Sequence, residues 1–258
     1  MNIVTVDWLE NNLDNKSIII LDCSWHLPNT NRSGIDEFQK ERIPGAVFFN
    51  IDEISDQESQ FPHMMPNENF FSKKVGELGI SNDHHIITYD ALGVFSSARV
   101  YWMFKQFGHK KISILDGGFK FWKIKNKKIE TTKPIKKTAT NYKCELDSSK
   151  IKQFEDIKKN IETKEYKLID ARPSGRFEGK DPEPRKELQS GSIKNSLNIP
   201  FNAIIDSETG CFKTKEELQK IFSDKQVHKE DPLIFSCGSG IAACVVGVAY
   251  ESLQGSDN

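Results

Sequence analysis

Short apolar runs alternate along the chain with longer segments that are typical of helices. The apolar runs have the length and composition of buried strands, and they occur at residues 17–22 (SIIILD), 85–90 (HIITYD), 111–115 (KISIL), 166–170 (YKLID) and 232–236 (PLIFS). Residues 5–13 and 94–108 have the character of helices. Strands that alternate with helices predict an α/β fold, in which a parallel sheet is flanked by helices.

The second half of the chain repeats the plan of the first half. Asp22 and Asp170 each end a predicted strand, and Cys237 takes the place that Asp90 holds in the first copy. Matching positions have similar offsets, since 170 minus 22 is 148, 193 minus 43 is 150 and 237 minus 90 is 147. Similar offsets in separate segments indicate a duplication. We therefore expect two tandem domains, of which only the second carries a cysteine at this position.

The predicted domains cover residues 1–125 and 150–258, and a linker over residues 126–149 joins them. The region from Lys123 to Ser149 is rich in lysine and threonine and has weak periodicity. A basic stretch could contact nucleic acid. Because aromatic residues are not interleaved with these lysines, a solvated linker is the favoured interpretation.

Composition narrows the class of protein further. The 258 residues carry a net charge of -1, which predicts no strong attraction to nucleic acid or to a membrane surface. The five cysteines have no C-x-x-C spacing, which favours free thiols in a reducing compartment. We expect no metal site, no organic cofactor, no membrane span and no signal peptide. The expected location is the cytoplasm, with the mitochondrion as the alternative.

A tight loop at residues 237–242 (CGSGIA) is the strongest candidate for chemistry. It lies between a predicted buried strand and an apolar, Ala- and Val-rich segment that predicts a buried helix. Backbone N–H groups of such a loop and the positive end of the helix dipole both favour the Cys237 thiolate over the thiol. A buried structural cysteine is the alternative, and the loop alone leaves the two interpretations about equally favoured.

The duplicated plan and this loop together resemble the rhodanese family of sulfurtransferases. The resemblance runs from about residue 5 to residue 250, with its most specific segments at 42–46 (RIPGA), 115–119 (LDGGF), 170–177 (DARPSGRF) and 237–244 (CGSGIAAC). Members that use thiosulfate carry basic residues just after the cysteine. Gly238 and Ser239 stand there in this chain, as in the members that use 3-mercaptopyruvate.

The resemblance also implies the substrate-binding residues. Arg176 and Arg185 match two arginines that hold the substrate in those members, and a guanidinium can pair bidentately with the carboxylate of an α-keto acid. The alternative for two arginines in a loop is surface charge. Gly238, Gly240, Ile241 and Ala242 complete the expected binding loop.

Three further residues match a relay that the family is proposed to use. Asp52 and His63 would join Ser239, whose polarised hydroxyl could hydrogen-bond the substrate and help to move protons. His63 could instead be a packed histidine with a structural role. Asp52 could equally cap a helix that begins near Glu53.

The resemblance implies a two-step transfer of sulfur. Cys237 would take sulfur from 3-mercaptopyruvate and release pyruvate, and a thiol acceptor such as a thioredoxin-like protein, or cyanide, would then remove the sulfur from the Cys237 persulfide. A thiosulfate:cyanide sulfurtransferase is one alternative. An inactive or regulatory rhodanese-like binding module is another.

The second copy is shorter than the first after the matching position. The strand at Ile112 begins 112 minus 90, or 22, residues after Asp90, whereas Asn258 lies 258 minus 237, or 21, residues after Cys237. We therefore expect the second domain to lack its last strand and helix. An exposed sheet edge would make that domain less stable than the first, prone to aggregation and weakly active.

Overall fold

The computed structural model describes residues 2–184 and 188–254. Contacts within the chain divide it into two compact units. Unit 1 comprises the residues up to Ser148 together with Ser207–Cys211, and unit 2 comprises Ser149–Asp206 and the residues from Phe212 onward. Each unit is described by itself below.

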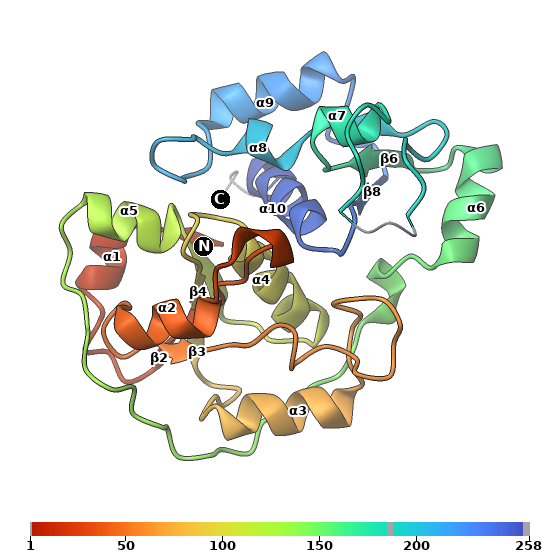
Figure 1. Cartoon of the computed structure of the whole chain (residues 1–258). Helices are drawn as coiled ribbons and strands as arrows, with labels where there is room; N and C mark the ends of the chain where they lie inside the picture. Colours follow the sequence, from red (N-terminus) through yellow and green to blue (C-terminus); the bar gives the residue numbers. More distant parts are fainter. Residues whose placement is uncertain (1, 185–187, 255–258) are drawn as a thin grey trace. The chain divides into compact units, whose positions relative to one another are not determined.

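Unit 1 is built around a parallel sheet of five strands in the order β1-β5-β4-β2-β3. Figure 1 labels three of them, β2, β3 and β4. The strands are β1 (Ile3–Val4), β2 (Ile18–Asp22), β3 (Val47–Phe48), β4 (His85–Tyr89) and β5 (Ile112–Leu115). The helices are α1 (Val6–Glu10), α2 (Gly34–Lys40), α3 (Glu68–Glu77), α4 (Ser96–Gln106) and α5 (Gly118–Ile124), with a 3-10 turn at Pro28–Thr30.

Alternating residues of the strands supply the core of unit 1. Ile20 of β2 and Ile87 of β4 belong to a cluster that also contains Leu9 of α1, Phe38 of α2 and Trp122 of α5, all of them buried. The remaining long helices, α3 and α4, pack on one another through aromatic rings, and α4 contacts β4 and β5. Buried strands of this kind give the near-continuous apolar runs seen in the sequence.

Unit 2 has a parallel sheet whose described strands are β6 (Lys167–Asp170), β7 (Leu197–Asn198) and β8 (Leu233–Ser236), in the order β7-β6-β8. Its helices are α6 (Phe154–Thr163), α7 (Ser174–Phe177), α8 (Phe201–Ile204), α9 (Lys215–Asp224) and α10 (Ala242–Gln254), after a 3-10 turn at Ser148–Lys150. Helices α8, α9 and α10 contact one another, and α10 packs on β8 (Figure 1).

The two sheets share the same local register, which confirms the predicted repeat and the α/β fold. Asp22 pairs with Tyr89, the residue before Asp90, and Asp170 pairs with Ser236, the residue before Cys237. In both units the carboxylate binds backbone just beyond its strand. Asp22 accepts a hydrogen bond from the Ser24 amide and Asp170 from the Arg172 amide.

The two sheets differ beyond β4 and β8, the strands that occupy matching places. In unit 1 the far side of β4 is paired with β5, while among residues 188–254 no strand pairs with the far side of β8. The exposure of the two strands differs accordingly. Ile86–Tyr89 of β4 are fully buried, whereas Leu233, Phe235 and Ser236 of β8 are only half-buried.

The expectation of a solvated linker over residues 126–149 needs correction. This segment belongs to unit 1 and runs along its surface, where the Thr140 amide donates to the Gly76 carbonyl over 2.9 Å. Tyr142 is 3% exposed and stacks on His109 with ring centroids 5.8 Å apart. Hydrogen bonds and one buried aromatic side chain therefore hold a segment whose composition suggested only solvation.

Ser207–Cys211, which lies far along the sequence, also belongs to unit 1. Lys120 donates to the Ser207 carbonyl over 2.7 Å. A Cβ on Gly93 would lie 2.5 Å from the Gly210 carbonyl oxygen, so a side chain at Gly93 would prevent this close approach. No helix in the described ranges is long and apolar enough to cross a membrane.

Candidate active site

The Cys237 side chain lies where β8 ends and the predicted tight loop begins. Its sulfur accepts a hydrogen bond from the Gly240 amide over 3.1 Å, and the thiol is half-buried. Gly240 has a φ of 74°, a conformation that favours glycine. Helix α10 begins two residues later, at Ala242. The amide and the helix N-terminus both favour negative charge on the sulfur.

The other loop residues hold this geometry in place. Ile241 is 1% exposed and anchors the loop in the core of unit 2. The Cys244 amide donates to the Ile241 carbonyl, and the Cys244 thiol donates to the Gly240 carbonyl over 3.1 Å. Cys244 is buried, so Cys237 is the more accessible of the two thiols.

Arg176 lies beside the same loop. It comes from α7, which follows β6, and the carboxyl ends of adjacent parallel strands meet at one edge of a sheet. A Cβ on Gly238 would lie 3.2 Å from Arg176 Nη2, so the guanidinium lies against the backbone next to Cys237. Gly238 is exposed, and its lack of a side chain keeps the space between loop and guanidinium open.

Arg176 is also part of a network of alternating charge that the sequence did not reveal. Its Nη2 and Nε donate to one carboxylate oxygen of Glu183, over 2.5 and 3.1 Å. The other oxygen of Glu183 accepts from Arg172 Nη1 over 2.9 Å. Arg172 in turn donates to Asp170 over 2.6 Å. Arg185, the second predicted arginine, lies outside the described residues.

Asp52 and His63 of unit 1 are hydrogen-bonded to each other. His63 Nε2 lies 2.9 Å from Asp52 Oδ1, and the Trp25 indole donates to both oxygens of Asp52 over 3.1 and 3.2 Å. The His63 ring is buried, its backbone has a φ of 57°, and Arg99 donates to its carbonyl over 2.5 Å. The sequence did not reveal Trp25 or Arg99, because both lie far from Asp52 along the chain.

Asp52 does not cap a helix, so that alternative is wrong. Residues 51–54 form a turn, and the Asn50 side chain accepts the hydrogen bonds from the Asp52 and Glu53 amides. The Asp52 carboxylate is thereby left for Trp25 and His63. Because Ser239 belongs to unit 2, its relay with this pair stays a prediction.

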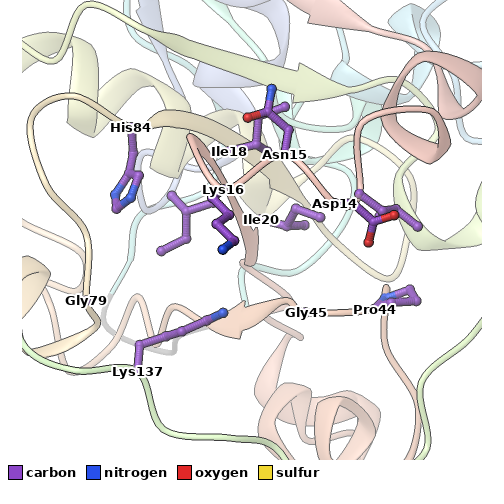
Figure 2. A pocket seen from close by; sticks show the side chains of 12 residues that line it. Asp14, Asn15, Lys16, Ile18, Ile20, Pro44, Gly45, Gly79, His84 and Lys137 are labelled. Atoms are coloured by element: carbon purple, nitrogen blue, oxygen red, sulfur yellow. The ribbon is translucent and has the colours of Figure 1, made fainter.

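A separate pocket in unit 1 has a volume of about 320 Å³ (Figure 2). Figure 2 shows Lys16 and Lys137 at this pocket together with the side chains of Ile18 and Ile20. Its lining contains no cysteine and none of the predicted site residues. We therefore place the candidate chemistry at the Cys237 loop and not in this pocket.

A model of the rhodanese-like domain matches residues 5–125 and 153–256, which together are most of the chain. The chain belongs to the rhodanese-like family. The 3-mercaptopyruvate sulfurtransferase of Rattus norvegicus is 43% identical over 229 residues, which cover 88% of this chain and 76% of the relative. The thiosulfate sulfurtransferase of Cricetulus griseus is 40% identical over 254 residues, which cover 96% of this chain and 84% of the relative.

A solved structure agrees with these relatives. SseA from Escherichia coli, described as a 3-mercaptopyruvate sulfotransferase with the rhodanese fold, has 34% identity and a TM-score of 0.89, covering 98% of this chain and 94% of its own. The predicted family and the two rhodanese-like domains are thus confirmed. The matches support sulfurtransferase activity, but relatives with either sulfur donor have similar identity. The cytoplasmic location stays a prediction.

Proposed function

We propose that this chain transfers sulfur from 3-mercaptopyruvate to a thiol acceptor through a persulfide on Cys237. The observation that carries the proposal is the position of the Cys237 sulfur. It lies 3.1 Å from the Gly240 amide, in the loop that leads into α10 and whose backbone lies against Arg176. A nucleophile, an anion-stabilising loop and a guanidinium are what an anionic sulfur donor requires.

The first half-reaction loads sulfur onto the enzyme. The Cys237 thiolate attacks the sulfur of mercaptopyruvate, a sulfur–sulfur bond forms, and the bond between that sulfur and the substrate carbon breaks. The electron pair of the broken bond leaves as the enolate of pyruvate, which is then protonated. Arg176 would bind the carboxylate during this step, and the Gly240 amide would remain bonded to the Cys237 sulfur.

The second half-reaction removes this sulfur from the enzyme. An acceptor thiolate attacks the outer sulfur of the persulfide, and the Cys237 thiolate is the leaving group. The relay that the family resemblance implies, of Ser239, His63 and Asp52, is proposed to polarise the substrate carbonyl and to move the proton. Because pyruvate leaves before the acceptor reacts, ping-pong kinetics are expected.

The test is release of pyruvate by the pure 258-residue chain in the presence of mercaptopyruvate and a small thiol. Cys237→Ser is expected to lower kcat/KM by at least about 10³-fold with an unchanged melting temperature, because a serine hydroxyl cannot replace the thiolate. Cys144→Ser is the matched control, since Cys144 is a half-buried thiol of unit 1 that contacts Ser72. Equal activity of Cys237→Ser and wild type would disprove the proposal.

Thiosulfate is the second candidate donor, because the thiosulfate sulfurtransferase of Cricetulus griseus covers 96% of this chain at 40% identity. The loop after Cys237 offers it no charged side chain. Mercaptopyruvate is expected to have at least about a tenfold higher kcat/KM, which equals about 1.4 kcal/mol in transition-state binding. Formation of thiocyanate from each donor, with cyanide as the common acceptor, measures the ratio, and no turnover with either donor would favour a binding module.

A further inference from the structure

Glu183 is a buried carboxylate clamped between two arginines. Its side chain is 3% exposed, and its two oxygens accept from Arg172 and Arg176 respectively. Charged groups are buried in this way only when they are paired and hydrogen-bonded. The clamp therefore holds the Arg176 guanidinium, through Nε and Nη2, in a fixed orientation beside Gly238.

The ion pairs of Glu183 also determine the net charge beside the proposed donor-binding group, Arg176. Asp170, Arg172, Glu183 and Arg176 alternate in sign, so the charges of this network cancel. The loop at 237–242 has no charged side chain, and an ionised Cys237 would add a negative charge. Arg176 Nη1 has no hydrogen-bond partner among the residues of 2–184 and 188–254, which leaves one edge of the guanidinium for a ligand.

We infer that Glu183 makes this site select monoanionic sulfur donors over dianionic ones. A single carboxylate can bind the open edge of Arg176 with little net repulsion. A second negative charge on the ligand is repelled by the Glu183 carboxylate, which pairs with the same guanidinium. The inference rests on the proposed function, since it treats Arg176 as the group that binds the donor.

The test compares two donors on wild type and on Glu183→Gln, which removes the charge and keeps an acceptor oxygen for Arg176. The ratio of kcat/KM for thiosulfate, a dianion, to that for mercaptopyruvate is expected to rise by at least about tenfold in Glu183→Gln. Glu178→Gln is the matched control. Glu178 is in the same segment and pairs with Lys180 at the surface, so its removal is expected to leave the ratio within about twofold.

A second measurement does not require turnover, and its first part uses wild type alone. Pyruvate and oxalate are similar in size, but pyruvate is a monoanion and oxalate a dianion. In NMR titrations of wild type, read at the Gly238 and Gly240 amides, oxalate is expected to bind no more tightly than pyruvate. In Glu183→Gln, where it folds, the affinity for oxalate is expected to rise at least about tenfold relative to pyruvate.

The outcomes separate the two proposals. A wild type that turns over neither donor would overturn the proposed function, while the titrations would still decide the role of Glu183. An unchanged donor ratio in folded Glu183→Gln would overturn the inference alone. Oxalate binding to wild type at least about tenfold more tightly than pyruvate would overturn it as well.

Discussion

The loop at residues 90–95 of unit 1 and the loop at 237–242 of unit 2 follow matching strands but begin with different residues, Asp90 and Cys237. Each follows a strand residue that pairs with an aspartate, and each has a glycine with positive φ at its fourth position, Gly93 at 124° and Gly240 at 74°. In unit 2 an amide of the loop donates to the Cys237 sulfur. In unit 1 the corresponding residue is a carboxylate.

The Asp90 carboxylate is bound by the backbone of its own loop. It accepts hydrogen bonds from the amides of Leu92, Phe95 and Ser97 over 3.0, 2.7 and 2.9 Å, and from the Ser97 hydroxyl over 2.6 Å. Asp90 is 1% exposed, and this burial raises the pKa of its carboxyl, while the hydrogen bonds from Ser97, Phe95 and Leu92 act in the opposite direction.

The comparison suggests that this kind of loop binds a negatively charged group. In unit 1, three backbone amides donate to the Asp90 carboxylate, so the chain itself supplies that group. With a thiol in the same place, the Gly240 amide of unit 2 can stabilise a thiolate or a persulfide that forms and is consumed during turnover. The first residue of each loop, Asp90 or Cys237, is therefore the difference that bears most directly on whether the loop is structural or a candidate for catalysis.

Removing the anion from unit 1 is expected to have the largest effect on stability. Asp90→Ala leaves three amides and a hydroxyl without their acceptor, which should lower the free energy of unfolding of unit 1 by about 4 kcal/mol. Formate should restore part of the loss by occupying the loop. Urea denaturation with and without formate measures both effects.

Asp83→Ala, a change at an exposed aspartate, is the control for this comparison. A loss below about 1 kcal/mol in Asp90→Ala would mean that the loop of unit 1 does not depend on a bound anion.

Asp22 gives the stability of unit 1 a dependence on pH. Burial raises the pKa of Asp22 from 3.8 to about 6, despite its hydrogen bonds from Ser24 and Tyr89. Folded unit 1 thus binds this proton more tightly than the unfolded chain does. The stability that Asp22 contributes is present below about pH 4 and is lost as the pH rises through 6.

In wild type, the free energy of unfolding is therefore expected to decrease by up to about 3 kcal/mol between pH 4 and 6. In Asp22→Asn this decrease is expected to be absent. Denaturant unfolding of unit 1 at several pH values measures this slope, and Asp83→Asn is again the exposed control. The prediction fails if wild type and Asp22→Asn have the same slope over this range.

The smallest predicted difference concerns the strands that lead into the two loops. Ile86–Tyr89 of β4 are buried and the strand is paired on both sides, whereas β8 is mostly half-buried and is paired only with β6 in the described part of the chain. Amides of β8 are expected to open with a free energy at least about 2 kcal/mol lower than those of β4. Hydrogen exchange measures this difference, and equal protection of both strands would contradict it.

The sequence was most informative where the structure depends on local pattern. The apolar runs predicted the longer strands, and the shared offsets predicted the equivalence of Asp90 and Cys237. The linker was misjudged because the burial of Tyr142 depends on His109 and Phe71, which are distant along the chain. Glu183 was missed for a related reason, since an ion network in an irregular segment leaves no periodic pattern.

The proposal that only the loop of unit 2 is catalytic is tested most directly by identifying the cysteine that becomes a persulfide. The chain is treated with mercaptopyruvate without an acceptor, digested and examined by mass spectrometry. One added sulfur atom is expected on Cys237 alone, because burial raises the pKa of the Cys23 and Cys144 thiols and disfavours their thiolates. Sulfur on Cys23, Cys144, Cys211 or Cys244 in place of Cys237, or on no cysteine, would contradict the proposed role of this loop.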